Sequence, residues 1–208
     1  MTLNQWLPML VLASSLLPGL LIFALPEHKH RTRSALNITG ALLKLALVLW
    51  MLWGVYNQQS YELRLAFLPE LDLVFRVGPL ALFFIILSSG LWLVTTIYAI
   101  GYLEGSPNRS RFFGFFSLCV TSTVGLAMAG NLFSFLLFYE MLTLATYPLV
   151  VHRGSEAARR AGRTYLAYTV VGGALLLAGT VWLYSLTGTL EFVPRGFVSN
   201  LDKSHHPD

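Results

Sequence analysis

Long apolar stretches separated by short polar loops dominate this chain. Stretches of roughly 20 apolar residues, the length that crosses a bilayer, lie near 5–25, 36–56, 78–102, 112–129, 131–151 and 163–186. At 1.5 Å per residue, a helix of about 20 residues covers the hydrocarbon thickness. The pattern therefore predicts an all-α integral membrane protein with six transmembrane helices.

The fourth and fifth stretches form a continuous apolar run about twice the length of one span. Only Gly130 and Asn131 interrupt this run. We therefore expect a tight reversal at 129–131, with Asn131 as the N-cap of the fifth helix, because asparagine side chains accept from free backbone N–H groups there.

Two segments differ from the spans in their pattern of polar and apolar residues. Polar and apolar residues alternate in part across 57–77, which predicts a short hairpin on the outer surface. The end of the chain, 188–208, is polar and is expected to be a solvated tail. The predicted organisation is a single membrane domain over 1–187 followed by this tail.

Composition supports the membrane assignment. Hydrophobic residues make up 55% of the chain and charged residues 12%, about half the charged fraction of soluble domains. The net charge of +4 does not indicate a nucleic-acid-binding protein, because no basic soluble domain is present to carry such a surface.

Basic residues collect in alternate loops and predict the orientation. Loops 26–35, 103–111 and 152–163 carry nine lysines and arginines, whereas the opposite side carries Arg64, Arg76, Arg195 and Lys203. By the positive-inside rule, both termini are expected on the non-cytoplasmic side of a plasma (inner) membrane.

Glu140 is the leading candidate for function, because it lies near the middle of the fifth span. A carboxylate at membrane depth is costly and usually serves proton relay, ion binding or charge pairing. Helical spacing places Thr143 and Tyr147 on the same face, which leads toward His152 at the cytoplasmic end. The alternative is a protonated carboxyl that only joins helices.

Pro148 adds to this picture, because a proline inside a helix removes a backbone donor and clashes with the carbonyl of Leu144. We expect a helix kink there, and the freed carbonyl could hold a water one turn from Glu140. A carboxyl in a dry site has a raised pKa, and an approaching cation lowers it. A moving cation could thus load and unload Glu140.

Two basic residues are weaker candidates. Lys44 lies within the second span, about 12 Å from the predicted cytoplasmic end of that helix. It is either a snorkelling lysine or a buried partner of a carboxylate. Arg163 opens the sixth span, where it is either a topology determinant or a functional group.

Other chemistries find little support in the sequence. His28, His30, His152, His205 and His206 all lie in loops or tails, so paired histidines in spans, as haem ligation requires, are absent. No glycine-rich phosphate loop and no metal-ligand spacing occurs, apart from acidic and histidine residues in the polar tail. We expect no catalytic site, no cofactor and no metal.

The fifth span also resembles a known family. Asn131-Leu132, Phe138-Tyr139-Glu140 and Tyr147-Pro148-Leu149 are similar to the antiporter-like membrane subunits of multisubunit Na+/H+ antiporters, above all the D-type subunit, and of respiratory complex I and membrane-bound hydrogenases. Tyr98-Ala99-Ile100-Gly101-Tyr102 followed by Arg111-Phe112-Phe113 matches as well. The resemblance covers roughly residues 65–195 and corresponds to the N-terminal half of such subunits.

The resemblance implies a role for Glu140 as the central carboxylate of a first half-channel, paired with a lysine on a seventh helix. That lysine and the second repeat of the family do not follow in this sequence. Three explanations stay open: a separate polypeptide supplies them, a half-size subunit lends Glu140 to a pathway between subunits, or the chain is a scaffold that has lost transport.

The sequence thus predicts a half-size subunit of a multisubunit cation/proton antiporter-like complex. Its partners would be the lipid bilayer and other membrane subunits, one of which carries the missing lysine-bearing helices. The alternative is a non-transporting structural subunit of a respiratory, hydrogenase-like or inorganic-carbon uptake complex. Membership of a redox-driven translocase is left open.

Overall fold

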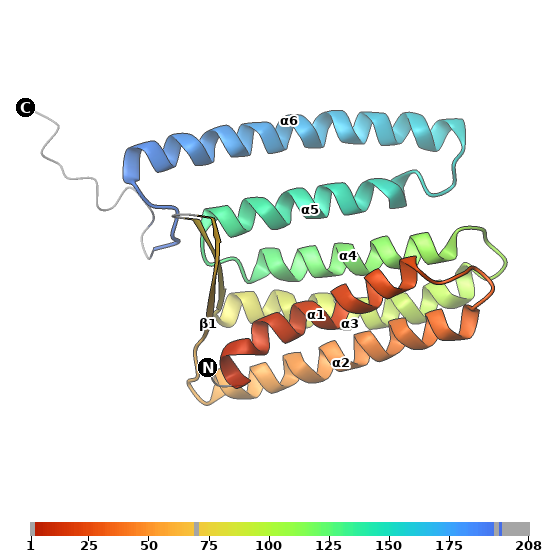
Figure 1. The fold of residues 1–208 in the computed structure, drawn as a ribbon, viewed down its shortest axis with the longest axis horizontal. Helices are drawn as coiled ribbons and strands as arrows, with labels where there is room; N and C mark the ends of the chain where they lie inside the picture. Colours follow the sequence, from red (N-terminus) through yellow and green to blue (C-terminus); the bar gives the residue numbers. More distant parts are fainter. Residues whose placement is uncertain (1–2, 69–70, 194–195, 197–208) are drawn as a thin grey trace, which may run out of the picture.

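Six long helices form the protein, and a two-stranded hairpin lies across one end of the bundle (Figure 1). The computed structural model describes residues 3–68, 71–193 and 196. The helices are α1 (Leu3–Phe23), α2 (His30–Tyr56), α3 (Pro79–Tyr102), α4 (Arg109–Ala127), α5 (Leu132–Val150) and α6 (Glu156–Thr187). All six are long and apolar enough to cross a membrane, which confirms the predicted helices.

The helix ends follow local capping chemistry. The side chain of Asn131 accepts from Ser134 N at 2.8 Å, and Ser155 accepts from Ala158 N at 3.2 Å, so each starts a helix. Gly188 ends α6 in the left-handed region, with φ 67°. Because Ser155 caps the helix, α6 starts at Glu156, seven residues before the predicted boundary at 163.

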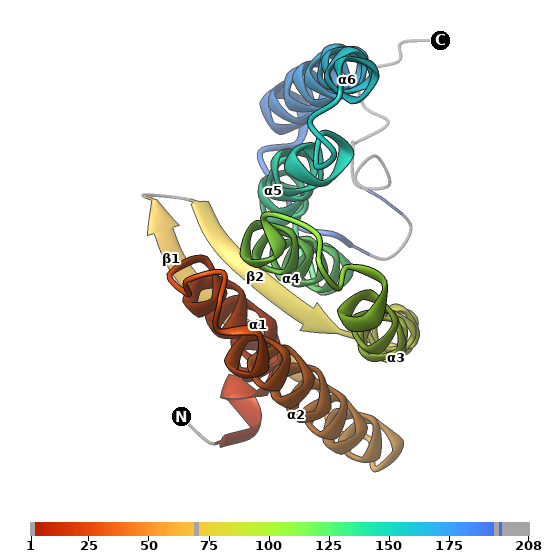
Figure 2. The ribbon, with the colours of Figure 1, turned by 90° about the vertical axis from the view of Figure 1, so that its right-hand side faces the viewer.

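The loops and strands that connect the helices lie in two regions at opposite ends of the bundle. The hairpin end comprises β1 (Tyr61–Leu68), β2 (Leu71–Val77), the reversal 128–131 and the segment 188–193, and the basic end comprises the loops 24–29, 103–108 and 151–155. In the view along the helices, α4, α5 and α6 lie in a row with α6 at the outer edge (Figure 2).

The structure contains the hairpin that the alternation in 57–77 predicted. Because of these two strands, the predicted all-α class is not strictly correct. β1 and β2 are antiparallel, with Tyr61 opposite Val77 and Leu65 opposite Leu73. The fold is therefore six helices plus a two-stranded sheet. Tyr61 is fixed by a close approach, since a Cβ on Gly54 would lie 1.8 Å from the Tyr61 hydroxyl.

The reversal between α4 and α5 is joined to the hairpin on one side and to the segment after α6 on the other. Gly130 N donates to Val74 O at 2.7 Å, and Leu132 N donates to Leu190 O at 2.8 Å. The first residues of the expected polar tail are thus held against the bundle. The rest of that tail, from 197 on, and Arg195 lie outside the described residues.

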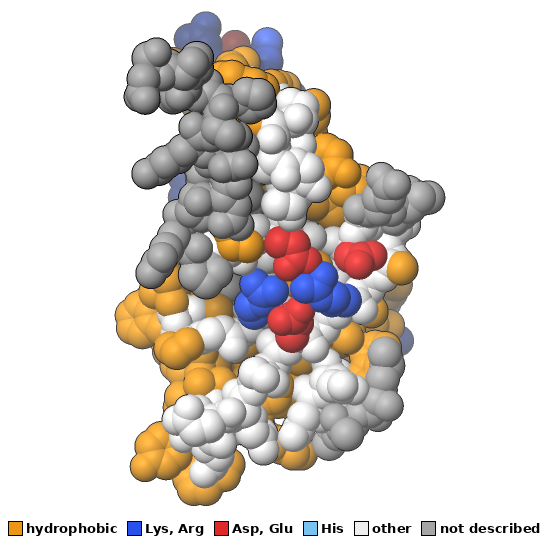
Figure 3. Space-filling model, turned by 90° about the vertical axis from the view of Figure 1, so that its left-hand side faces the viewer, with side chains coloured by type: hydrophobic (Ala, Val, Ile, Leu, Met, Phe, Trp, Pro, Cys, Tyr) orange, Lys and Arg blue, Asp and Glu red, His pale blue; other side chains and the backbone are white. Residues whose placement is uncertain are grey.

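Four charged side chains form a cluster near the centre of the hairpin end (Figure 3). Arg64 binds Glu62 at 2.9 Å and also Glu191, while Arg76 reaches Glu62 at 3.2 Å and Glu191 at 3.4 Å. These ion pairs tie the segment after α6 to both strands.

Beneath the hairpin lies the main apolar core. Every element except α6 contributes to it: Leu7, Val11 and Leu12 of α1, Val48 and Met51 of α2, Tyr61, Leu63, Phe75 and Val77 of the hairpin, Leu82 and Ile85 of α3, Val124 and Met128 near the end of α4, and Phe138 of α5. The core seals the hairpin end of the α1–α4 bundle, and polar side chains begin deeper in.

Candidate functional site

Glu140 lies in the middle of α5, and its carboxyl group faces α6. A Cβ added to Gly173 of α6 would lie 2.0 Å from Glu140 Oε1, so the absent side chain of this glycine makes room for the carboxylate. Among the described residues, Glu140 has no hydrogen-bond or ion-pair partner. A carboxyl group so placed can accept a proton or a cation from outside this part of the chain.

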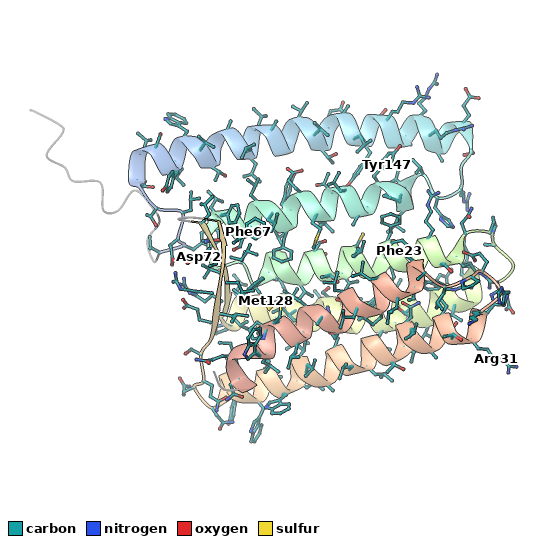
Figure 4. The ribbon with its side chains drawn as sticks, in the orientation of Figure 1. Phe23, Arg31, Phe67, Asp72, Met128 and Tyr147 are labelled. Carbon is teal, nitrogen blue, oxygen red and sulfur yellow. The ribbon has the colours of Figure 1, made fainter. Side chains whose placement is uncertain are left out.

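Hydroxyl groups follow the α5–α6 contact from Glu140 toward the basic end. Thr143 is buried one turn along α5, and the Thr146 hydroxyl bonds to the Tyr165 hydroxyl of α6. Tyr147 packs over Gly162, whose Cβ would lie 3.0 Å from the Tyr147 ring (Figure 4). The polar face predicted for α5 therefore lies against α6.

In the opposite direction from Glu140 the same helices bound an apolar groove of about 340 Å³. Its lining from α5 and α6 includes Leu136, one turn before Glu140, and Leu177, one turn after Gly173. The carboxyl group thus stands at a boundary, with hydroxyls on its basic-end side and apolar side chains on its hairpin-end side.

His152 lies just beyond α5, at the basic end. Its ring packs edge-on against Phe112 with centroids 5.3 Å apart, and its Nδ1 is buried without a partner among the described residues. Burial lowers the pKa of His152, and the positive charge of Arg111 lowers it further. The imidazole is therefore held toward its neutral form, in which it can accept a proton.

Pro148 and Arg163 occupy positions of different kinds. Pro148 lies in the last turn of α5, which continues to Val150, and its carbonyl accepts from Arg111 Nη2 at 3.4 Å. Arg163 is exposed on α6. The structure thus places Arg163 at the basic end, away from the α5–α6 contact that Glu140 occupies.

Lys44 belongs to a separate cluster. It is 0% exposed, and Nζ donates to Ser15 Oγ of α1 at 2.7 Å and lies 5.4 Å from the Trp92 ring centroid of α3. The helix begins at His30, so Lys44 lies about 21 Å along α2, deeper than predicted. The snorkelling alternative is wrong for this conformation, and no carboxylate of the described residues lies within 4.0 Å of Nζ.

The site therefore divides into two parts. Glu140 and Tyr147 lie at the α5–α6 contact, with the buried Thr143 between them on the same face of α5. His152 lies at the basic end of this contact, whereas Lys44 lies among α1–α4. Lys44 is not the partner of Glu140 in this structure.

Several polar residues in the second part were not recognised from the sequence. They are Ser15, Asn37, Ser117 and Thr121, all buried in the α1–α4 bundle. Arg33, predicted in a loop, is 2% exposed on α2. One signal was present in the sequence: Arg33, Asn37 and Lys44 are spaced by four and seven, which places them on one helical face.

Family models match two regions of the chain. One, described as NADH-ubiquinone oxidoreductase (complex I) chain 5 N-terminus, matches residues 69–113. The other, described as NADH:quinone oxidoreductase/Mrp antiporter, TM, matches residues 129–200 and includes Glu140.

Curated relatives carry the same kinds of description. NAD(P)H-quinone oxidoreductase subunit 5 of the Zygnema circumcarinatum chloroplast is 28% identical over 92% of this chain and 29% of its own length. The D-type subunit of a Na(+)/H(+) antiporter from Alkalihalophilus pseudofirmus is 25% identical over 83% of this chain and 34% of its own. The chain thus spans about a third of the length of these relatives.

Solved structures share the fold. A chain of the Mrp complex from a Dietzia species superposes with a TM-score of 0.77 and 21% identity, covering 92% of this chain and 36% of that one. A chain of the archaeal membrane-bound sulfane sulfur reductase gives a TM-score of 0.74 at 19% identity, covering 90% and 38%. Together, the matches confirm the resemblance to antiporter-like membrane subunits.

Proposed function

We propose that this relative of the antiporter-like subunits is a membrane subunit of a multisubunit cation/proton antiporter-like complex, in which Glu140 provides the proton-binding group of a half-channel. The observation that carries the proposal is the setting of Glu140: a carboxyl group at mid-helix, facing a glycine, with no partner of its own among the described residues. The matched segment 129–200 includes this residue.

In the proposed mechanism, protons reach Glu140 from the basic end. Thr143, the Thr146–Tyr165 hydroxyl pair and Tyr147 line the route, and a neutral His152 accepts protons at its mouth. Arg163 and the other basic loop residues set the local electrostatic field at this mouth. The apolar groove beyond Glu140 prevents the proton from continuing directly to the hairpin end.

Unloading Glu140 requires a second charge. A cation that approaches the carboxylate stabilises its ionised form and releases the proton, and withdrawal of that cation favours proton uptake again. Lys44 cannot be this cation, because it donates to Ser15 in another part of the bundle. We assign the cation to a lysine of a neighbouring subunit or segment whose helices pack against α5 and α6.

We also infer the orientation and the location of the subunit. The basic end faces the cytoplasm, the hairpin end and both termini of this chain face the opposite side, and the complex lies in the plasma (inner) membrane. The asymmetry of lysine and arginine between the two ends supports this orientation.

The test is Glu140→Gln in the assembled complex, assayed for cation-driven proton movement in inverted vesicles. Loss of coupled transport with unchanged co-purification of the partner subunits is expected, because glutamine cannot ionise. Glu156→Gln is the matched control, since Glu156 is exposed in the first turn of α6 and should be silent. Full antiport by the Glu140 variant would overturn the proposed role.

A structural role is the second candidate, because α6 presents an outward apolar face that a neighbouring subunit could cover. Leu175, Val181 and Trp182 on this face are 69%, 60% and 70% exposed. If the subunit only spaces or seals a complex, Glu140→Gln leaves transport intact while a bulky residue at Gly173 disrupts assembly.

A further inference from the structure

A polar column runs inside the α1–α4 bundle, apart from the Glu140 site. On α2 it begins with Arg33 and continues through Asn37 to Lys44, which are 2%, 0% and 0% exposed. The spacing of four and seven residues places the three side chains on one face over about 16 Å of helix.

The facing helices supply hydroxyl groups to this column. Lys44 Nζ donates to Ser15 Oγ at 2.7 Å, and Ser15 Oγ lies 2.8 Å from Thr121 Oγ1. One turn before Thr121, Ser117 Oγ donates to Asn37 Oδ1 at 3.4 Å. These bonds connect Lys44 to α1 and α4, and they place Asn37 next to the same helix face.

The column retains donors that nothing in the described part of the chain satisfies. Asn37 Nδ2 and Trp92 Nε1 are buried without an acceptor, and the Lys44 ammonium has three N–H groups but a single acceptor among the described residues, Ser15. Leaving buried polar groups unpaired is costly. Water is the ligand that suits them, because it can accept from these donors and donate to the neighbouring hydroxyls.

The close approach of α1 and α2 leaves a further polar atom beside the column. Pro18 has no N–H, so the carbonyl of Ser14 lacks its helical partner. A Cβ on Gly40 would lie 2.9 Å from that carbonyl oxygen, so the oxygen lies against α2 one turn before Lys44.

The two ends of the column differ. Beyond Lys44, α2 continues with Val48 and Met51, both 0% exposed in the main apolar core. At the other end, Arg33 Nη1 donates to Ser110 Oγ at 2.7 Å and lies 3.4 Å from Glu27 Oε2, whose side chain is 50% exposed. Between Arg33 and Asn37 there is a single helical turn, which one or two waters can bridge.

We propose that this column is a hydrated path that opens at Glu27 on the basic end and closes beyond Lys44, so that Lys44 exchanges its proton with the basic end alone. On release, an N–H bond of the ammonium breaks, Nζ keeps the electron pair, and the chain of hydroxyls and waters passes one proton to water at the basic end. Uptake is the reverse, and no oxidant or reductant takes part.

The charged and titratable groups along the path come from the basic end and from α2, and α3 contributes the uncharged Trp92. Those groups are Glu27, His30, Arg33 and Lys44, with Arg109 at the start of α4. The proposal does not depend on the role of Glu140, since no residue is shared between the column and the α5–α6 contact.

Cysteine accessibility tests the path. Cys119 is the single cysteine of the chain, so Cys119→Ser gives a background without thiols. Ser117→Cys and Ser15→Cys place a thiol in the column, whereas the controls Val48→Cys and Met51→Cys place one in the apolar core. Oriented proteoliposomes are exposed to Ag+ from one side, and the thiols that remain free are then labelled with a maleimide after denaturation.

The column thiols should react with Ag+ from the basic end, with rates roughly tenfold or more above the core thiols, because only a hydrated thiol ionises and reacts readily. Ag+ added at the hairpin end should leave both sets labelled by the maleimide. Equal protection of column and core thiols, or faster reaction from the hairpin end, would overturn the hydrated path.

A second measurement detects the protonation state of Lys44 directly. Lys29→Arg with Lys203→Arg leaves Lys44 as the sole lysine of the chain, so a ¹⁵N-lysine label gives one Nζ signal. The signal should follow the pH at the basic end and ignore the pH at the hairpin end, and Asn37→Leu should abolish the response. A signal that ignores basic-end pH in the folded protein contradicts the proposal.

Discussion

At the scale of single residues, the contact between Glu140 and Gly173 can be tested without altering the carboxylate. Alanine at 173 would place Cβ 2.0 Å from Glu140 Oε1, so the flexible side chain must rotate away. At the neighbouring Gly172, a Cβ would meet nothing closer than the Tyr139 hydroxyl at 3.7 Å. We expect Gly173→Ala to lower coupled transport severalfold and Gly172→Ala to leave it unchanged, both measured in vesicles. Equal transport by the two variants would separate Gly173 from the function of Glu140.

A second single-residue prediction concerns the packing of α4 against α5. A Cβ on Gly125 would lie 2.3 Å from the ring of Phe138, which is buried in the main core. Overpacking of this kind costs about 1–3 kcal/mol, so Gly125→Ala should unfold at lower denaturant concentration in mixed micelles. Gly90→Ala is the control, because its Cβ would meet open space. A Gly125 variant as stable as the control would show that Phe138 can move aside.

The residue scale also shows what the sequence could reveal. Glu140 was selected as a candidate because a lone carboxylate in an apolar helix is costly, which is visible without a structure. The partners of Lys44 were not, because Ser15 and Thr121 resemble ordinary small residues of transmembrane helices. Their contact joins positions 106 residues apart, and only the packing of α1 against α4 creates it.

At the scale of elements, the ion pairs of the hairpin end fasten the segment after α6, and pH should loosen them. The hydrogen bond from Arg64 lowers the pKa of Glu191 despite partial burial. Burial alone would raise the pKa of Glu62, but the bonds from Arg76 and Arg64 outweigh it and lower the pKa. A carboxyl group whose pKa is lowered in the folded state stabilises that state fully at pH values above the ordinary glutamate pKa. The stabilisation is lost as the pH falls through the folded-state pKa.

The measurable consequence is faster amide exchange at Leu132 and Phe192, which bond across this segment, below about pH 4. The change should be small, since exposed ion pairs contribute less than about 1 kcal/mol. Glu191→Gln should exchange faster at neutral pH and lose most of the acid dependence. Identical pH profiles of variant and parent, after correction for intrinsic exchange, would contradict this account.

The elements themselves were largely predictable, and their errors have a common cause. Hydropathy located all six helices but missed the polar first turns of two of them. In the structure α2 begins at His30 and α6 begins at Glu156, both before the apolar stretches. Those turns lie at the basic end, where charged residues are compatible with helix. Arg33 was therefore assigned to a loop, although the fold buries it against Ser110. The hairpin was visible as alternation, but its bonding to 128–131 depends on tertiary contact.

At the scale of the whole molecule, burial is uneven across the bundle, and the outer helix is the least enclosed. In the apolar window of α6 11% of residues are buried, against 56% for α4. The buried residues of α6, Gly162, Gly173 and Thr180, lie where it faces α5. Lipid can solvate the remaining apolar side chains as well as a protein can, so exposure by itself does not distinguish a lipid-facing helix from one that docks.

Hydrogen exchange of the purified chain in nanodiscs, compared with the assembled complex, makes that distinction. Few packing contacts imply a low free energy of local opening, so α6 should exchange faster than α4 in the chain alone. Assembly should slow amide exchange in α6 and leave it unchanged in α4, if partner helices cover the α5–α6 face and bring the lysine proposed to act on Glu140. An α6 that exchanges at the same rate in both preparations would mean that this face meets lipid, and the lysine proposed to work against Glu140 would then have no position from which to do so.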